Sequence, residues 1–114
     1  MADGQIYIDP DEGMGRVLGN KALYTKLLVK FKEGTNLDGL MSALDAVDYE
    51  NAQAAAHTIK GIAANLSLKE LHLQAQEIEA QIKNKAVSPE IIESIKVCFA
   101  ETLASVDKVI EQNG

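Results

Sequence analysis

The chain has 114 residues, a length that suits one domain, and 46% of them are apolar. Its formal net charge of −6 argues against nucleic acid as a partner, because contacts with phosphates require a basic surface. No apolar run is long enough to span a bilayer, and the N-terminus lacks the features of a secretory signal. A single cysteine, Cys98, excludes an intrachain disulfide. These features favour a cytoplasmic protein that does not associate with a membrane.

The first predicted helix is short and begins at Pro10. Asp9 can act as its N-cap, and Glu12 completes a pattern similar to a capping box. Three glycines within residues 13–19 weaken the helix. Their spacing matches neither the dinucleotide-binding fingerprint nor the P-loop, so a nucleotide site is not indicated.

Two further helices are predicted before residue 48. Asn20 is the expected N-cap of the first, which should end near Gly34. Its apolar positions are Leu23, Tyr24, Leu27, Leu28 and Phe31. The second should start at Thr35 or Asn36, with a buried seam formed by Leu37, Leu40, Leu44 and Val47.

A long amphipathic helix is predicted over residues 49–66, with Asp48 as its cap. Its apolar stripe is formed by Tyr49, Ala52, Ala56, Ile59, Ala63 and Leu66. At about 100° per residue, His57 lies roughly 130° from the centre of this stripe and should face solvent. Most of its neighbours on that face are small, including Ala54, Gly61 and Ala64.

The residues around His57 suggest a chemical role. An imidazole is a nucleophile, and Lys60, one turn later, can place a positive charge beside an anion held on the ring. Glycine inside a helix costs about 0.5–1 kcal/mol relative to alanine, so Gly61 needs a reason. Clearance for an approaching protein is one reason, and close packing of a neighbouring helix is another. His57 as an ordinary surface residue is the plain alternative.

The next helix is expected after Ser67, which is the predicted cap. Its seam is formed by Leu68, Leu71, Ala75, Ile78 and Ile82. Because the preceding link is only about two residues long, the two helices should be antiparallel neighbours. This register places Gln76 and Glu79 level with His57, where they either reach the imidazole or remain solvated surface residues.

The last helix should begin at Ser88-Pro89-Glu90 and continue to the C-terminus. Together the elements predict an all-α fold, an antiparallel four-helix bundle with a short extra N-terminal helix. No metal site is expected. Ala54 and Lys69 stand three residues before His57 and His72, at the positions where a di-iron site needs Glu. His72 is expected to be a surface residue without an obvious partner.

The segment His57-Thr58-Ile59-Lys60-Gly61 resembles the signature of histidine-containing phosphotransfer (HPt) domains, with Ser67 at a position where the family usually has Gly. The resemblance covers roughly residues 6–85 and is weak beyond them. It implies one HPt domain over residues 1–114. It also implies that His57 is the phosphoacceptor and that Lys60 stabilises the charge of the phosphoryl group. Glu79 would orient the ring, because family members often have an apolar-Glu pair that matches Ile78-Glu79.

The same resemblance implies the partners. These are a response-regulator receiver domain, a hybrid histidine kinase, or both, which would bind over Gln53, Gly61, Ala64 and Gln76. The carrier itself would need no cofactor, because Mg²⁺ belongs to the receiver. It would have no catalytic activity of its own and would work as a monomer. Two alternatives remain. One is a helical adaptor that binds a signalling partner through the His57 face without phosphorylation, and the other is the phosphotransfer module of a chemotaxis-type kinase.

Overall fold

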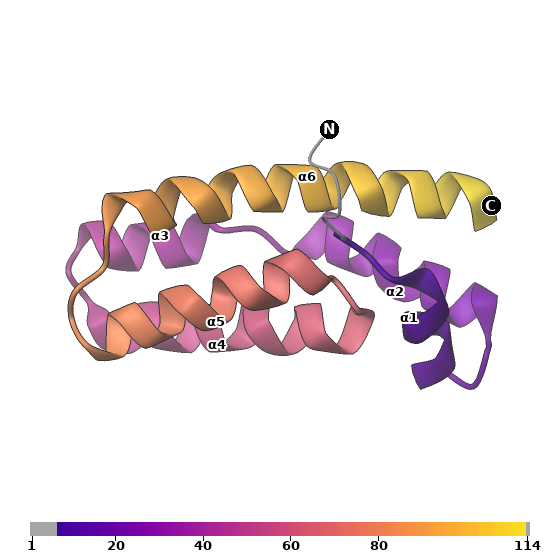
Figure 1. The fold of residues 1–114 in the computed structure, drawn as a ribbon, viewed down its shortest axis with the longest axis horizontal. Helices are drawn as coiled ribbons and strands as arrows, with labels where there is room; N and C mark the ends of the chain where they lie inside the picture. The colour runs from indigo at the N-terminus through magenta and orange to yellow at the C-terminus, as the bar shows by residue number, and fades with distance from the viewer. Residues whose placement is uncertain (1–6, 114) are drawn as a thin grey trace.

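The computed structural model describes residues 7–113, and within that range every regular element is a helix (Figure 1). The helices are α1 (Pro10–Arg16), α2 (Lys21–Gly34), α3 (Asp38–Asp45), α4 (Tyr49–Leu66), α5 (Lys69–Lys83) and α6 (Pro89–Asn113). α2 and α3 follow one another along the length of α6 (Figure 1). They fill one of four bundle positions, α4, α5 and α6 fill the others, and α1 is the extra short helix. The predicted all-α helical bundle is confirmed.

The helix starts follow the capping residues that the sequence supplies. The side chains of Asp9, Asn20 and Asp48 each accept a backbone N–H of the first turn of α1, α2 and α4. Ser88 Oγ accepts the backbone N–H of Ile91 at the start of α6. α3 is different. Its N-cap position is occupied by Leu37, and the side chain of the preceding Asn36 accepts the N–H of Asp38 at 2.9 Å.

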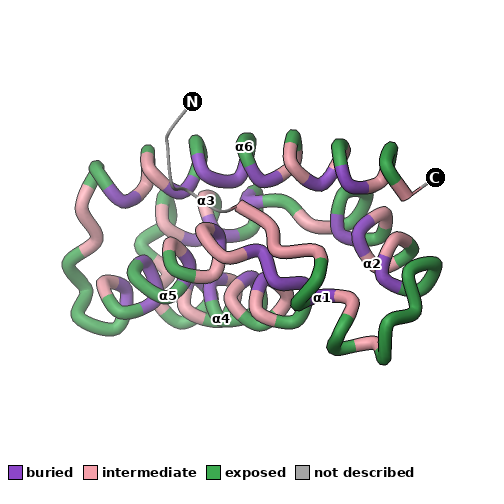
Figure 2. Tube along the Cα trace, turned by 45° about the vertical axis from the view of Figure 1, so that its right-hand side comes forward, coloured by how far each residue is buried: buried purple, intermediate pink, exposed green. Residues whose placement is uncertain are grey.

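The core is one continuous cluster of apolar side chains on the inner faces of the helices. Buried positions follow the side of α6 that faces α2 and α5 (Figure 2). The predicted seam of α5 is buried throughout, as is the α4 stripe except Tyr49, which is half-buried. In α6, Phe99 packs against Phe31 of α2, with ring centroids 5.8 Å apart.

Two positions of the predicted core, Val47 and Leu23, are wrong. Val47 is 62% exposed, because α3 ends at Asp45 and Val47 adopts a left-handed φ of 56° in the turn before α4. Ala43, which no apolar pattern had marked, is buried in α3, whereas Leu44 is only half-buried. Leu23 is exposed in the first turn of α2, whereas the next residue, Tyr24, is fully buried.

Ser67 is also not the cap of α5. It ends α4 in a left-handed conformation with φ 59° and ψ 41°, and Leu68 precedes α5 without a side-chain cap. Its hydroxyl donates instead to Glu12 Oε1 of α1 at 2.8 Å, and its carbonyl accepts the N–H of Asp9. Lys69 pairs with the same Glu12 carboxylate at 2.6 Å. α1 therefore fixes the turn that sets the register between α4 and α5.

Candidate functional site

His57 stands on the outer face of α4, where the periodicity of the helix places it. Its neighbours on the inner face, Ala56 and Ile59, are buried in the core, while the His57 side chain is 70% exposed. The prediction that this imidazole faces solvent is confirmed. Because the inner stripe anchors α4 over its full length, the ring is presented on a rigid element.

Glu79 of α5 lies beside the ring and is almost fully buried, with 5% of its side chain exposed. Its Oε2 is 3.3 Å from Nδ1 of His57, and its Oε1 is 2.6 Å from Nζ of Lys60. The antiparallel register predicted this height. α4 and α5 thus bring His57 and Lys60 together with Glu79, which lies 22 residues after His57 in the sequence.

The charges around Glu79 keep it ionised. Its pKa is lowered from the ordinary value of 4.5, first because Lys60 donates a hydrogen bond to it and further because of the positive charges of Lys60 and Lys83 and, when its ring is protonated, of His57. Burial acts in the opposite direction. An ionised carboxylate only accepts hydrogen bonds. A neutral His57 bonded to Glu79 therefore carries its proton on Nδ1, which leaves the lone pair on Nε2.

An open groove runs past the imidazole between α4 and α5. It is lined by Glu50, Gln53, Ala54, His57, Glu79 and Lys83. The predicted partner-binding residue Gln53 is thus beside the ring. Gln76 is exposed on α5, and within residues 7–113 no hydrogen bond joins it to His57. Of the two candidates from α5, Glu79 is the one that contacts the ring.

Gly61 has open space on its outer side. A Cβ atom added there would meet no heavy atom within 4 Å outside the adjoining chain and the backbone of the helix. Close packing of a neighbouring helix is therefore not the reason for this glycine, and clearance for an approaching molecule remains. Ala64, half-buried one turn further on, lines a separate groove near the α4–α5 turn, together with Arg16 and His72.

His72 has a partner, contrary to expectation. It is half-buried, and its Nδ1 lies 3.3 Å from the backbone carbonyl oxygen of Lys60. The same antiparallel register that pairs His57 with Glu79 brings these two residues together, so the signal was present in the sequence. His72 links α5 to α4 behind the site.

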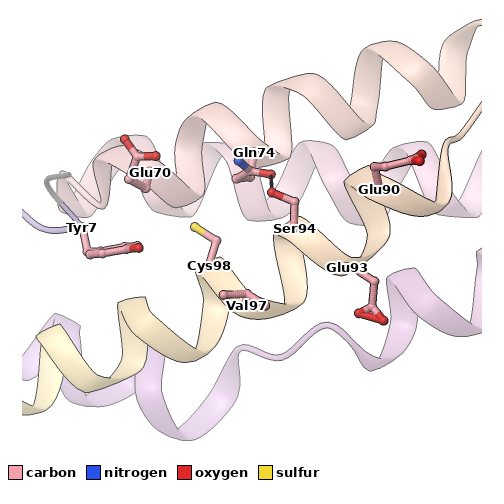
Figure 3. Close-up of a pocket in the computed structure, with 8 residues that line it drawn as sticks. All are labelled: Tyr7, Glu70, Gln74, Glu90, Glu93, Ser94, Val97 and Cys98. Carbon is pink, nitrogen blue, oxygen red and sulfur yellow. Dashed lines mark hydrogen bonds between the residues drawn. The ribbon is translucent and has the colours of Figure 1, made fainter. Parts of the chain in front are cut away.

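A second groove, between α5 and α6, has a different chemistry (Figure 3). Glu70, Glu90 and Glu93 lie along it, and Ser94 donates a hydrogen bond to Gln74 at 2.8 Å. Burial raises the pKa of the Cys98 thiol, so this thiol stays protonated near neutral pH and is a poor nucleophile. Among the described residues, no group of three His, Cys, Asp or Glu side chains is placed to hold a metal ion.

The comparison with protein families agrees with this geometry. Residues 32–111 match the family model of the Hpt domain. The matched segment includes most of α6 and omits α1 and most of α2. The expected coverage of residues 6–85 was therefore wrong at both ends. No curated protein and no solved structure gives a significant match. No helix within residues 7–113 has the length and hydropathy to cross a bilayer. Because the match spans more than half of the chain, the protein belongs to the Hpt domain family, whose members carry phosphoryl groups in two-component phosphorelays.

Proposed function

We propose that this chain is a phosphoryl carrier in which Nε2 of His57 accepts a phosphoryl group and passes it on. The donor would be an aspartyl phosphate on a receiver domain, or a hybrid histidine kinase, and the acceptor another receiver. The main support is the exposed imidazole whose Nδ1 faces the buried Glu79 carboxylate at 3.3 Å. This contact favours the tautomer in which Nε2 is the nucleophile.

The transfer step requires only the imidazole and the aspartyl phosphate as reactants. The Nε2 lone pair attacks the phosphorus of the aspartyl phosphate, the Nε2–P bond forms, and the bond between phosphorus and the aspartate oxygen breaks. The aspartate leaves as a carboxylate, and the imidazole becomes a phosphorylated imidazolium that keeps its proton on Nδ1. Glu79 accepts that proton in a hydrogen bond and stabilises the positive charge of the ring as it develops. In the reverse step, neutral imidazole leaves.

Lys60 would support the phosphoryl group electrostatically. Its ammonium is bound to Glu79 and lies one helical turn from His57. From there its charge lowers the energy of an anion on the ring, although it is not placed to act as the nucleophile. Mg²⁺ would be needed only on the receiver, so the carrier is proposed to have no cofactor and no autonomous catalytic activity. A monomer in the cytoplasm would meet these requirements.

The proposed docking surface surrounds the ring on α4 and α5. Gln53 lines the groove beside His57, and Gly61 provides clearance on its other side. Ala64 and the exposed Gln76 extend the surface along the two helices. Small side chains on α4 would let a receiver bring its aspartate close to Nε2.

The test is transfer of labelled phosphate from the receivers of the same organism, each phosphorylated beforehand and mixed with this chain. Label should move onto the wild-type chain as an acid-labile, alkali-stable adduct, and His57→Gln should take none. Because His57 is exposed, this variant should retain its fold, which circular dichroism can check. If His57→Gln is still labelled, the assignment is wrong. If a receiver binds the wild type without transfer, the protein is a helical adaptor instead.

A further inference from the structure

We infer that Lys83 is a second phosphoryl-binding cation, which reaches the phosphoryl group on His57 from the groove side. This inference rests on the carrier function proposed above, and it assigns a role to a residue that the sequence pattern did not mark. Lys83 lies in the last turn of α5, four residues after Glu79. It lines the same open groove as the imidazole of His57.

The two lysines around Glu79 are held very differently. Lys60 donates to Oε1 at 2.6 Å, and only 27% of its side chain is exposed, so its ammonium is fixed by the carboxylate. Nζ of Lys83 lies 4.0 Å from Oε2, which is beyond hydrogen-bonding distance, and 57% of its side chain is exposed. Lys83 therefore keeps its ammonium free to move toward a new anion in the groove.

The position of Lys83 relative to the ring follows from the oxygen that both approach. Oε2 of Glu79 faces Nδ1 of His57 at 3.3 Å and Nζ of Lys83 at 4.0 Å. The ammonium and the imidazole thus approach the same carboxylate oxygen, while Lys60 occupies the other oxygen. A lysine side chain is a flexible chain of four carbons, so its ammonium can move toward an anion attached to the ring.

The charge balance of the phosphorylated site calls for another cation. The phosphoryl group brings two negative charges, and Glu79 contributes one. The imidazolium and Lys60 together supply two positive charges, which leaves one negative charge uncompensated. Glu50 lines the same groove and adds to the negative side. Among the described residues that line this groove, Lys83 is the one that can supply the missing positive charge.

The alternative is that Lys83 only stabilises the helix through its i,i+4 pairing with Glu79. Only the lysine of this pair is exposed, but at 4.0 Å the pair is at the limit for an ion pair and makes no hydrogen bond, so it contributes little. Removing the charge should therefore leave the fold intact, so that a change in reactivity can be measured on a folded protein.

The experiment uses phosphoramidate as a small phosphoryl donor, so that no receiver surface is involved. Its phosphorus–nitrogen bond breaks, ammonia leaves, and the bond to Nε2 of His57 forms. We expect Lys83→Gln to slow phosphorylation of His57 about three- to tenfold at low salt. Lys83→Arg should restore the rate to within about twofold because it keeps the charge. The control Lys96→Gln, an exposed lysine of α6 outside the groove, removes the same net charge and should react like the wild type.

Salt distinguishes a charge effect from a structural one. At about 1 M salt the Debye length falls to about 3 Å, so the difference between the wild type and Lys83→Gln should nearly vanish. A structural defect would persist. The inference is overturned if Lys83→Gln reacts like the wild type at low salt, or if its defect is independent of salt. That result leaves the carrier function standing. Label that persists in His57→Gln would instead refute the carrier function itself.

Discussion

Replacing Glu79 with glutamine tests the physical basis of the site, because it removes one charge and almost no volume. The carboxylate is buried and holds the Lys60 ammonium at 2.6 Å and the His57 imidazole at 3.3 Å. A hydrogen bond to a charged group contributes about 1.5–3 kcal/mol. The amide oxygen of glutamine can still accept from Lys60, so part of this contribution remains. We expect the free energy of unfolding of Glu79→Gln to be about 1–2 kcal/mol lower at pH 7, which corresponds to a fall in Tm of about 4–8 °C.

The pH dependence gives the sharper test. The pKa of Glu79 is lowered in the folded protein, mainly by the hydrogen bond from Lys60, so the folded state favours the ionised form. The resulting stabilisation is fully present above the ordinary pKa of 4.5 and is lost as the pH falls through the lowered value. The stability difference between the wild type and Glu79→Gln should therefore be constant from about pH 6 to 8 and shrink below about pH 5.

The assay is urea unfolding followed by circular dichroism at a series of pH values. Glu77→Gln is the matched control, because Glu77 is exposed on the same helix. Its carboxylate accepts a hydrogen bond from the side chain of Gln81, one turn later in α5. Its stability should stay within about 0.5 kcal/mol of the wild type. Equal stability of Glu79→Gln and the wild type at pH 7, or a stability difference that does not change between pH 7 and pH 4, would refute the reasoning about the buried carboxylate.

Four further substitutions probe Gly13 of α1 and the residues Gly61 and Lys60 of α4. Gly13→Ala should lower the free energy of unfolding by about 1–3 kcal/mol in urea, because the added methyl group would overlap the buried ring of Tyr24; an unchanged midpoint would contradict this packing. Gly61→Ala should raise the free energy of unfolding by about 0.5–1 kcal/mol, since alanine favours the helix and its Cβ meets only open space. Gly61→Phe should instead block transfer from a receiver while the helix content stays the same. Normal transfer by the phenylalanine variant would show that this face is not the docking surface. Lys60→Ala should slow transfer about ten- to a hundredfold without loss of helix content, and a rate equal to the wild type would remove Lys60 from the mechanism.

The sequence alone determined where α1, α2, α4 and α6 begin and which side of α4 and α5 is buried. Capping residues such as Asp9, Asn20 and Asp48 act on backbone groups three residues away, so their effect is readable from local spacing. Periodicity likewise placed His57 on the outer face of α4. The short link after α4 fixed an antiparallel register, and that register brought Glu79 level with His57.

Only the tertiary structure decided how these residues contact one another. Three features depend on how closely α5 lies against α4. These are the burial of Glu79, the contact of its two carboxylate oxygens with Lys60 and His57, and the contact of His72 with the Lys60 carbonyl. The left-handed Ser67 depends on α1, whose Glu12 accepts its hydroxyl. Periodicity describes one helix at a time, so it predicts which face is inward but not the distance or the partner across the interface. That is why His57, Lys60 and Glu79 could be found from the sequence, whereas the contacts that join them and the place of Lys83 in the groove became visible only in the packed bundle.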